Sequence, residues 1–497
     1  MKRALALCLL ALPLAAAEPG QGPQVKVRVG TATVQLPLER YVAGVLAGES
    51  SVFRSNEALK AMAVAARTYA VRLRGRHASE GFDFCDTTHC QRLDLAAVTP
   101  RLEAIVQETA GQLLWFEGKP AFACYTRDCG GRSEDAAAVW PEQAAPYLRS
   151  HDDPYCLRAA PAGSAWQWNA DPRQVADALG RALLTAPHRL ERIEIESATP
   201  SGRARTLVLA GAGERVRIAA GSFRFAMGRE VGWNTVRSDF YRVHTAGGRL
   251  VFEGRGSGHG VGLCQDGAEQ MGLEGHTWRE ILAFYYPGTE AGLTARGIPW
   301  QHIAGEHISL ATTRPQADGP LLATAERQLR AAAARTHLAA PGKIEIRVYP
   351  DLDTFRNATG EPGWVAAHTA NRRIDLQPAD LLRSRGALED TLRHELLHVL
   401  IEAHAAPGLP LWFREGFVEY LDGTPPAATA PARVPLDTDL QQTADPARAR
   451  RAYRDAAATV ASLAQRYGET ALFDWLRTGL PPAVTNTSSS QAPTKSK

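Results

Sequence analysis

The chain has 497 residues, of which 45% are hydrophobic and 22% are charged, and its formal net charge is +3. This length is enough for two or three domains, and the composition is that of an ordinary globular protein. A net charge this small does not indicate a surface for nucleic acid, so we expect no nucleic-acid partner.

The N-terminus has the pattern of a secretory signal peptide. Lys2 and Arg3 form its charged start, Ala4–Leu14 its apolar run and Ala15–Ala17 a cleavage site of small residues. No later stretch is apolar for long enough to span a membrane. We therefore expect residues 1–17 to be removed and the mature protein to be exported, without a membrane span, to the periplasm or cell wall.

Beyond the signal peptide, the periodicity predicts an α+β fold in two domains, at residues 24–300 and 302–480. In the first domain, Asn56 is expected to cap an alanine-rich helix at Glu57–Arg72. Residues 481–497 are rich in Ser, Thr, Pro and Gln and lack apolar periodicity, so we expect a disordered tail. The other expected elements are a hairpin at Gln24–Leu36, strands within Leu190–Ile218 and at Lys343–Tyr349, helices within Asp266–Tyr286 and at Glu389–Ala403 and Arg448–Tyr467, and a Pro/Ala loop at Thr424–Arg433.

Glu49 is the first candidate for chemistry, because it ends an apolar run that begins at Tyr41. A carboxyl group that follows apolar residues and points into a groove has a raised pKa, which a general acid needs near neutral pH. The alternative is a surface glutamate at the end of a helix.

A cluster of thiols and imidazoles follows the alanine-rich helix. Cys85, His89 and Cys90 lie within six residues, and His77 upstream is a candidate for a fourth ligand. Thiolate and imidazole suit tetrahedral Zn²⁺. A Cys85–Cys90 disulfide is the rival interpretation for an exported protein, and the spacing alone favours neither.

The second half of the chain contains an H-E-x-x-H motif, which begins at His394 and ends at His398. On a helix these two imidazoles share a face and can bind one Zn²⁺, while Glu395 activates a water molecule. A catalytic site needs a third protein ligand and an open position. Glu415 on a following helix is the candidate for that ligand, and Glu419, one turn later, is the alternative.

The N-terminal domain resembles the SpoIID/LytB family, the stage II sporulation protein D domain. The resemblance rests on the run EALKAMAVAARTYA at Glu57–Ala70, GHGVGLCQ at Gly258–Gln265 and YYPGT at Tyr285–Thr289. It implies a mixed α/β domain that cuts peptidoglycan glycan strands as a lytic transglycosylase. Glu49 falls on the position of the family's catalytic glutamate.

The same resemblance favours zinc in the thiol and imidazole cluster, since the family's zinc site uses cysteines and histidines in a matching segment. Four protein ligands would close that site, so its zinc would be structural. Arg67, His259 and Gln265, which lie in the matching motifs, are assigned to substrate binding. Of the other cysteines, Cys129 in a glycine-rich turn and Cys156 in an extended loop are the preferred disulfide.

The C-terminal domain looks, more loosely, like a gluzincin metallopeptidase over residues 302–479. In that arrangement the third ligand is the Glu of a W-x-x-E-G segment, here Trp412–Gly416. The resemblance implies a zincin-like α+β domain that holds a catalytic Zn²⁺ and acts on a peptide or protein. A metallopeptidase-like module without metal is the alternative.

Together these predictions describe an exported, sporulation-related cell-wall protein with one structural and one catalytic Zn²⁺. Its N-terminal domain would cleave glycan strands, and its C-terminal domain would be a zinc-dependent peptidase. Two alternatives remain open. The first domain is a non-catalytic wall-binding module that enhances an amidase, or it targets the metallopeptidase, as the only enzyme, to the envelope.

Overall fold

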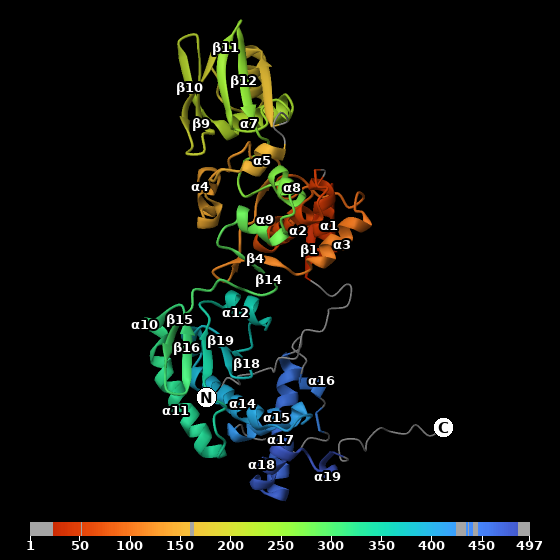
Figure 1. The fold of residues 1–497 in the computed structure, drawn as a ribbon, viewed down its shortest axis with the longest axis vertical. Helices are drawn as coiled ribbons and strands as arrows, with labels where there is room; N and C mark the ends of the chain where they lie inside the picture. The colour runs from red at the N-terminus through yellow and green to blue at the C-terminus, as the bar shows by residue number, and fades with distance from the viewer. Residues whose placement is uncertain are drawn as a thin grey trace, which may run out of the picture. The chain divides into compact units, whose positions relative to one another are not determined.

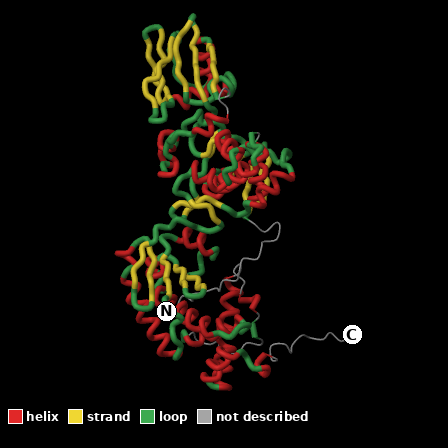
Figure 2. Tube along the Cα trace, in the orientation of Figure 1, coloured by secondary structure: helices red, strands yellow, loops and turns green. Residues whose placement is uncertain are grey.

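The computed structural model of the chain describes residues 23–50, 52–159, 164–423, 434–435, 437–440 and 446–485. The predicted signal peptide, the predicted Pro/Ala loop and most of the predicted tail lie outside these residues. The described residues form two compact units, which we call the N-terminal unit (residues 23–116 and 120–297) and the C-terminal unit (residues 117–119 and 298–485). Both units mix helices with strands, so the fold class is α+β, as predicted (Figures 1 and 2).

The helical core of the N-terminal unit is built around the alanine-rich helix α2 (Asn56–Arg72), whose side chains are buried along most of its length. Ser55 caps this helix instead of the predicted Asn56, because its hydroxyl accepts a hydrogen bond from the backbone N–H of Ala58 at 3.3 Å. The small alanine side chains leave room for four helices to pack closely around α2, namely α1 (Leu38–Glu49), α3 (Pro100–Glu108), α8 (Gln265–Leu273) and α9 (Trp278–Tyr285).

The predicted hairpin at the start of the chain is confirmed as β1 (Gln24–Val29) paired with β2 (Ala32–Pro37). Short strands, two short helices and turns complete this core. They are β3 (Phe84–Cys85), β4 (Leu113–Phe116), β5 (Lys119–Pro120), β6 (Tyr125–Thr126), α4 (Ala136–Val139), α5 (Pro154–Ala159), β13 (Leu263–Cys264) and β14 (Glu290–Gly292), with single 3₁₀ turns at Ala78–Glu80, Pro141–Gln143 and Pro146–Leu148.

Residues 165–255, which we call the sheet lobe, lie between α5 and β13 in the chain and have their own apolar core. Two antiparallel sheets of three strands form it, in the orders β11-β12-β7 and β10-β9-β8. Only the second sheet was predicted from the sequence, although the Gly247-Gly248 turn is a hairpin signal between β11 and β12. The elements are β7 (Ala165–Ala170), α6 (Pro172–Arg181), β8 (Arg192–Ala198), β9 (Ala204–Gly211), β10 (Glu214–Ala219), α7 (Ala220–Glu230), β11 (Tyr241–Ala246) and β12 (Arg249–Arg255).

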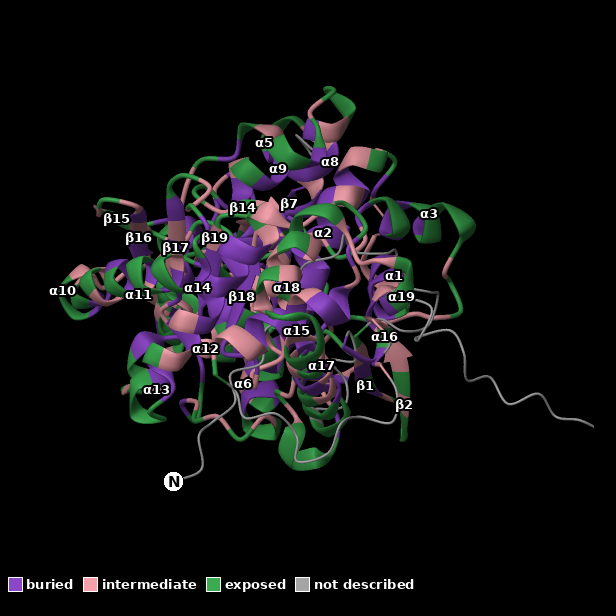
Figure 3. Cartoon of the chain, turned by 90° about the horizontal axis from the view of Figure 1, so that it is seen from below, coloured by how far each residue is buried: buried purple, intermediate pink, exposed green. Residues whose placement is uncertain are grey.

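The C-terminal unit contains one mixed sheet of five strands in the order β15-β16-β17-β19-β18. The middle three strands pair in parallel, and the two edge strands are antiparallel to their neighbours. Helix α14 packs against α11, α15 and the edge strand β18, and Figure 3 colours much of the ribbon around α14 as buried. The strands are β15 (Gln301–Ala304), β16 (Ile308–Thr312), β17 (Ile344–Val348), β18 (Ala367–Ala370) and β19 (Arg373–Leu376).

The helices predicted at Glu389–Ala403 and Arg448–Tyr467 are confirmed as α14 and α17. The predicted disordered tail is wrong at its start, because Pro482–Thr485 forms a short helix with Val484 buried. Within the described residues, every helix is too short or too polar to cross a membrane. The helices are α10 (Pro315–Asp318), α11 (Pro320–Thr336), α12 (Leu352–Thr359), α13 (Ala379–Ser384), α14 (Leu388–His404), α15 (Leu411–Leu421), α16 (Asp437–Leu440), α17 (Pro446–Tyr467), α18 (Glu469–Thr478) and α19 (Pro482–Thr485).

Candidate functional sites

Glu49 is the last residue of α1, and a neighbouring segment holds its carboxylate in place. The backbone N–H of Arg92 donates a hydrogen bond to Glu49 Oε1 at 2.9 Å. The segment can lie directly on α1 because Gly48 has no side chain, since a Cβ there would meet the carbonyl oxygen of Arg92 at 2.3 Å. Gly44 allows the same close approach one turn earlier, beside Leu93. The glycines of α1 therefore decide where the Glu49 carboxylate lies.

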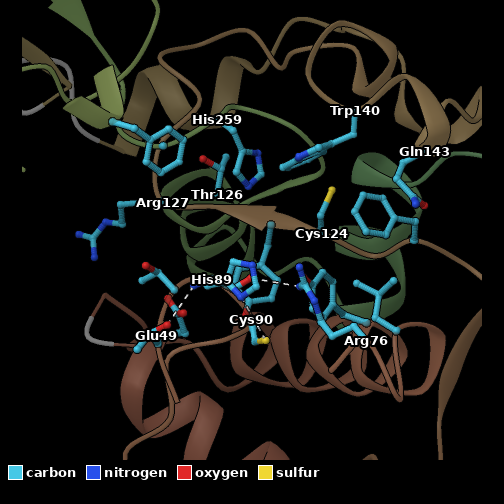
Figure 4. Close-up of a pocket in the computed structure, with 18 of the residues that line it drawn as sticks. Glu49, Arg76, His89, Cys90, Cys124, Thr126, Arg127, Trp140, Gln143 and His259 are labelled. Atoms are coloured by element: carbon cyan, nitrogen blue, oxygen red, sulfur yellow. Dashed lines mark hydrogen bonds between the residues drawn. The ribbon is translucent and has the colours of Figure 1, made fainter. Parts of the chain in front are cut away.

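Glu49 lines a cavity of about 980 Å³ in the N-terminal unit. Figure 4 shows Glu49 and Cys90 on one side of this cavity and His259 and Trp140 on the opposite side. His259 belongs to the glycine-rich loop that precedes β13, and Gln265, which also lines the cavity, begins α8. The structure thus brings Glu49 together with His259 and Gln265, which were predicted from a distant motif.

Burial sets the protonation of two groups in this cavity, Glu49 and His259. It raises the pKa of Glu49 above its ordinary value, and the hydrogen bond from Arg92 opposes this shift only in part. It lowers the pKa of His259 to about 3, with a smaller contribution from the nearby Arg224 guanidinium. The backbone N–H of Val261 donates to His259 Nδ1 at 3.1 Å, so Nε2 carries the proton of the neutral ring. Glu49 is suited to hold a proton, and His259 is suited to donate a hydrogen bond.

The four predicted zinc ligands meet at the edge of the same cavity. The ligand atoms of His77, Cys85, His89 and Cys90 all lie within 4.8 Å of one another. Cys90 Sγ is 3.3 Å from His77 Nε2, and Cys85 Sγ is 3.8 Å from His89 Nδ1. Glu80 lies 2.6 Å from His77 Nδ1, which leaves Nε2 directed at the thiols, an outer contact that is common for metal-binding histidines. Both cysteines are free thiols, and the donor set fits one tetrahedral Zn²⁺.

The two thiols of this cluster differ in acidity. Burial raises the pKa of Cys90 to about 11. For Cys85, hydrogen bonds from Thr87 and His89 outweigh burial and lower the pKa to about 7. One ligand of the cluster, His89, is exposed to solvent, whereas Cys90 is buried.

Two sequence-based assignments in this unit need correction. Arg67 does not bind substrate, because its side chain is fully buried and pairs with Glu39, with an Nη2–Oε2 distance of 2.6 Å. Its other donors reach the backbone carbonyl oxygens of Val106 and Gln112, so its role is structural.

The disulfide between Cys129 and Cys156 is also absent from the structure, in which both residues are free thiols. Cys156 lies on helix α5 and not in the extended loop that the sequence suggested.

Aromatic side chains that sequence reasoning missed complete the cavity. Trp140 packs edge-on against His259, with ring centroids 4.8 Å apart. Phe225 and Trp233, from the sheet lobe, also line the cavity and remain 49% and 55% exposed. An exposed tryptophan within a polar segment is an available sequence signal for a binding surface, but nothing in the sequence relates it to Glu49.

The H-E-x-x-H motif lies on α14, where it forms a buried cluster with α15. His394 Nε2 and His398 Nε2 are 3.1 Å apart, and His398 Nε2 is 3.4 Å from Glu415 Oε2. These three side chains are at most 2% exposed. Both oxygens of Glu415 are buried and lack a hydrogen-bond donor among the described residues, so a cation at this point would satisfy them. The structure therefore places His398 next to both of the other predicted ligands, and imidazole and carboxylate are donor types that Zn²⁺ accepts.

Helix α15 is fixed against its neighbours at several points. Asp437 of α16 accepts hydrogen bonds from the backbone N–H groups of Leu411 and Trp412 and so caps the start of α15. Gly416 lets α17 approach closely, because a Cβ there would meet the carbonyl oxygen of Ala456 at 2.5 Å. These contacts hold the helix face that bears Glu415 against α14.

Glu395 is fully buried beside this cluster, and its Oε2 accepts a hydrogen bond from the hydroxyl of Thr369 on β18. Burial raises the pKa of Glu395 well above its ordinary value, and the nearby Asp422 carboxylate adds to the shift. Asp422 itself lies 3.7 Å from His394 Nδ1, the side of the ring that faces away from His398. It was missed, although it follows Glu415 by seven residues and so falls on the same helix face. Glu419, the alternative ligand, is also buried.

Comparison with known proteins identifies the N-terminal half. A family model described as stage II sporulation protein matches residues 29–116, the stretch that contains Glu49, α2 and the four-ligand cluster. The chain is 31% identical over 275 residues to stage II sporulation protein D of Bacillus subtilis (strain 168), which covers 51% of this chain and 74% of the relative. The same protein of Bacillus amyloliquefaciens is 30% identical over 282 residues, with 51% and 74% covered. The chain therefore belongs to the stage II sporulation protein D family.

A further relative is named as an amidase enhancer. The amidase enhancer of Bacillus subtilis (strain 168) is 25% identical over 285 residues, which cover 50% of this chain and 39% of the relative. The sequence-based resemblance of the N-terminal domain is thus confirmed at the level of the family.

Proposed function

We propose that the N-terminal unit is an exported lytic transglycosylase that cleaves peptidoglycan glycan strands, with Glu49 as its acid and base. The observation that carries this proposal is one carboxyl group of raised pKa in the wall of a cavity of about 980 Å³. A cavity of this size can hold several sugar rings. Membership of the stage II sporulation protein D family supports the same conclusion.

One carboxyl group is sufficient for this reaction. Protonated Glu49 gives its proton to the glycosidic oxygen as the bond from that oxygen to the anomeric carbon breaks. The C6 hydroxyl oxygen of the same sugar then bonds to the anomeric carbon, and Glu49 takes up the hydroxyl proton. The products are an anhydro sugar and a new chain end, no water is consumed, and Glu49 returns to its starting state.

Other groups in the cavity suit a glycan ligand. His259 is held neutral with Nε2–H as a donor, which is the form that hydrogen-bonds a sugar oxygen. Phe225 and Trp233 offer exposed ring faces against which the apolar face of a sugar can pack. Gln265 supplies an amide that can donate and accept.

We further propose that the His77, Cys85, His89 and Cys90 cluster holds a structural Zn²⁺. A bound ion would tie the segment before Arg92 to the loop that follows α2. Arg92, which follows Cys90 by two residues, supplies the N–H that holds Glu49. Zinc at this position would therefore orient the acid without contacting the substrate.

For the C-terminal unit we propose a gluzincin-like zinc peptidase. His394, His398 and Glu415 would hold Zn²⁺, which supplies a Lewis acid and lowers the pKa of a water molecule when bound. Glu395 would serve as the base beside the ion, and the hydroxyl of Thr369 orients its carboxylate. Asp422 orients His394 through Nδ1. The orphaned Glu415 oxygens are the observation that supports this proposal.

Digestion of purified glycan strands tests the first proposal. We expect the full chain to release products with anhydro ends, as measured by mass spectrometry. Products with reducing ends would show that water attacks instead, and no products at all would remove the transglycosylase assignment.

A second function for the N-terminal unit is favoured by the similarity to an amidase enhancer. In that case the cavity binds glycan without cleaving it. Glycan binding by the full chain without products, together with faster wall digestion by an added amidase, would support this second function over the first.

A further inference from the structure

A second cluster of metal-type ligands is buried in the N-terminal unit. Cys129, Asp153, Cys156 and Cys264 place three Sγ atoms and a carboxylate oxygen within 4.8 Å of one another. All four side chains are buried, and each cysteine is at most 1% exposed. They come from separate places in the sequence, namely the loop after β6, the start of α5 and the end of β13.

The spacing within this cluster matches that of ligands around one small cation. Cys129 Sγ lies 3.3 Å from Asp153 Oδ2. In a tetrahedral zinc site with bonds of about 2.0–2.3 Å, neighbouring ligand atoms lie roughly 3.3–3.8 Å apart. The ligand atoms of the His77, Cys85, His89 and Cys90 cluster meet the same 4.8 Å limit.

Asp153 has a local role as a helix cap, but only one of its oxygens is needed for it. Asp153 Oδ1 accepts a hydrogen bond from the backbone N–H of Cys156 at 2.9 Å. Oδ2 instead faces the cluster, where it accepts from the Tyr285 hydroxyl at 2.9 Å. Two further groups surround the thiols: Asp128 Oδ1 is 3.1 Å from Cys156 Sγ, and the backbone N–H of Cys129 is 3.3 Å from Cys264 Sγ. Contacts of this kind orient ligands around a metal.

The number of thiols argues against a disulfide as the purpose of the cluster. A disulfide uses two sulfur atoms, so it would leave one buried thiol and a buried carboxylate beside it. Three thiolates and one carboxylate fill the coordination of one Zn²⁺ completely. A closed site of this kind is structural.

We propose that Cys129, Cys156, Cys264 and Asp153 form a structural site for one Zn²⁺ ion. The ion would fasten the chain where it leaves the helical core for the sheet lobe, at Cys156, to the place where it returns, at Cys264. A link between residues so far apart restricts the unfolded chain strongly. Because Gln265 follows Cys264 directly, the same link would fix one wall of the glycan cavity.

Zinc content of the full chain tests this proposal. The protein is purified without added oxidant, and zinc is counted by inductively coupled plasma mass spectrometry. Cys264→Ser is expected to lose one zinc per chain relative to the wild type. Cys124→Ser is the matched control, because Cys124 is equally buried but lies outside the cluster, and it is expected to keep the wild-type count. An unchanged count in Cys264→Ser overturns the proposal.

Two further measurements keep the test decisive if Cys264→Ser does not fold. Asp153→Asn keeps all three thiols and is expected to lose zinc to a chelator faster than the wild type. Peptide mapping of the unmutated chain is expected to find Cys129, Cys156 and Cys264 as free thiols. A disulfide between any two of them, or wild-type zinc retention in Asp153→Asn, overturns the proposal.

The other proposed zinc sites are separated by their own variants. Cys90→Ser and Glu415→Ala are each expected to lose one zinc, independently of Cys264→Ser. Loss in those variants without loss in Cys264→Ser leaves the other two sites standing and removes this one.

Discussion

The two candidate active sites are built in opposite ways. In the N-terminal unit, a half-buried glutamate at the end of a helix faces an open cavity, and its partners come from loops. In the C-terminal unit, four polar side chains on two packed helices are at most 2% exposed. The first arrangement leaves room for a polymer and shifts the pKa of one group by partial burial. The second leaves the Glu415 carboxylate without a hydrogen-bond donor among the described residues, and a cation would satisfy it.

The largest expected effect is at the acid of the open site. Glu49→Gln keeps the shape of the side chain but removes its proton, so glycan cleavage should fall about 10²–10⁴-fold while the fold is retained. The measurement is the release of anhydro-ended products. Glu142→Gln is the matched control, because Glu142 lines the same cavity and is exposed. Equal rates for the wild type and Glu49→Gln would contradict the assignment.

In the enclosed site of the C-terminal unit, substitutions distinguish the proposed base from the proposed metal ligands. Glu395→Gln should lower peptidase activity by about 10²–10⁴-fold yet keep the metal, because we assign Glu395 as a base and not as a ligand. Glu415→Ala should lose the metal itself, whereas Glu419→Ala should retain it. Zinc content and hydrolysis of a casein substrate are measured together. Loss of zinc from Glu419→Ala alone would make Glu419 the third ligand instead.

A smaller effect is expected at Asp422, which contacts the predicted ligand His394. Asp422→Asn keeps the size of the side chain but weakens its hold on His394 Nδ1, so zinc affinity should fall about 10- to 100-fold. Competition with a chelator measures this change. Asp474→Asn, on an exposed part of α18, is the control and should leave the affinity unchanged. The idea fails if both variants bind zinc as the wild type does.

Substitution in the His77, Cys85, His89 and Cys90 cluster should lower the thermal stability of the protein. Cys90→Ser should lower zinc content, and it should lower the melting temperature by about 5 °C or more, because the bound ion stabilises the folded chain. Calorimetry with and without a chelator measures this. A Cys85–Cys90 disulfide in freshly purified protein would instead support the redox interpretation.

The smallest effect concerns the pH dependence of stability. The pKa of Glu49 is higher in the folded than in the unfolded chain, so the folded state holds an extra proton between the two values. The stabilising contribution is therefore complete below the unfolded pKa and is lost as pH rises through the folded pKa. Glu49→Gln lacks this loss, so its stability relative to the wild type should increase across that window. Urea unfolding at several pH values measures it, and parallel curves would show that burial does not act on Glu49.

The enclosed site was predicted more fully from sequence than the open one, for a physical reason. His394, Glu395 and His398 are neighbours on one helix, so their spacing alone places them together. Glu415 required only a second helix that packs on the first, which the Pro407–Pro410 loop allowed. Asp422 was not predicted, because it contacts the ligand His394 and is not itself one of the predicted ligands.

The open site depends on contacts between distant segments, which no local pattern reveals. Glu49 and His259 were predicted from separate motifs, but their common cavity exists only because loops and the sheet lobe meet there. Arg67 was wrongly predicted to bind substrate because it lies inside a dense motif. Its side chain is instead buried in the core, where it pairs with Glu39. A motif therefore mixes residues that build the site with residues that act in it.

The hydrogen bond that holds Glu49 comes from the main chain of Arg92, and this has a consequence for how the site tolerates change. Every amino acid except proline supplies a backbone N–H. Any residue except proline at position 92 therefore keeps this donor, although the charge of the Arg92 side chain also lowers the pKa of Glu49. Proline is the one substitution there that removes the donor. A backbone group can therefore be essential to an active site even where several side chains are acceptable at that position.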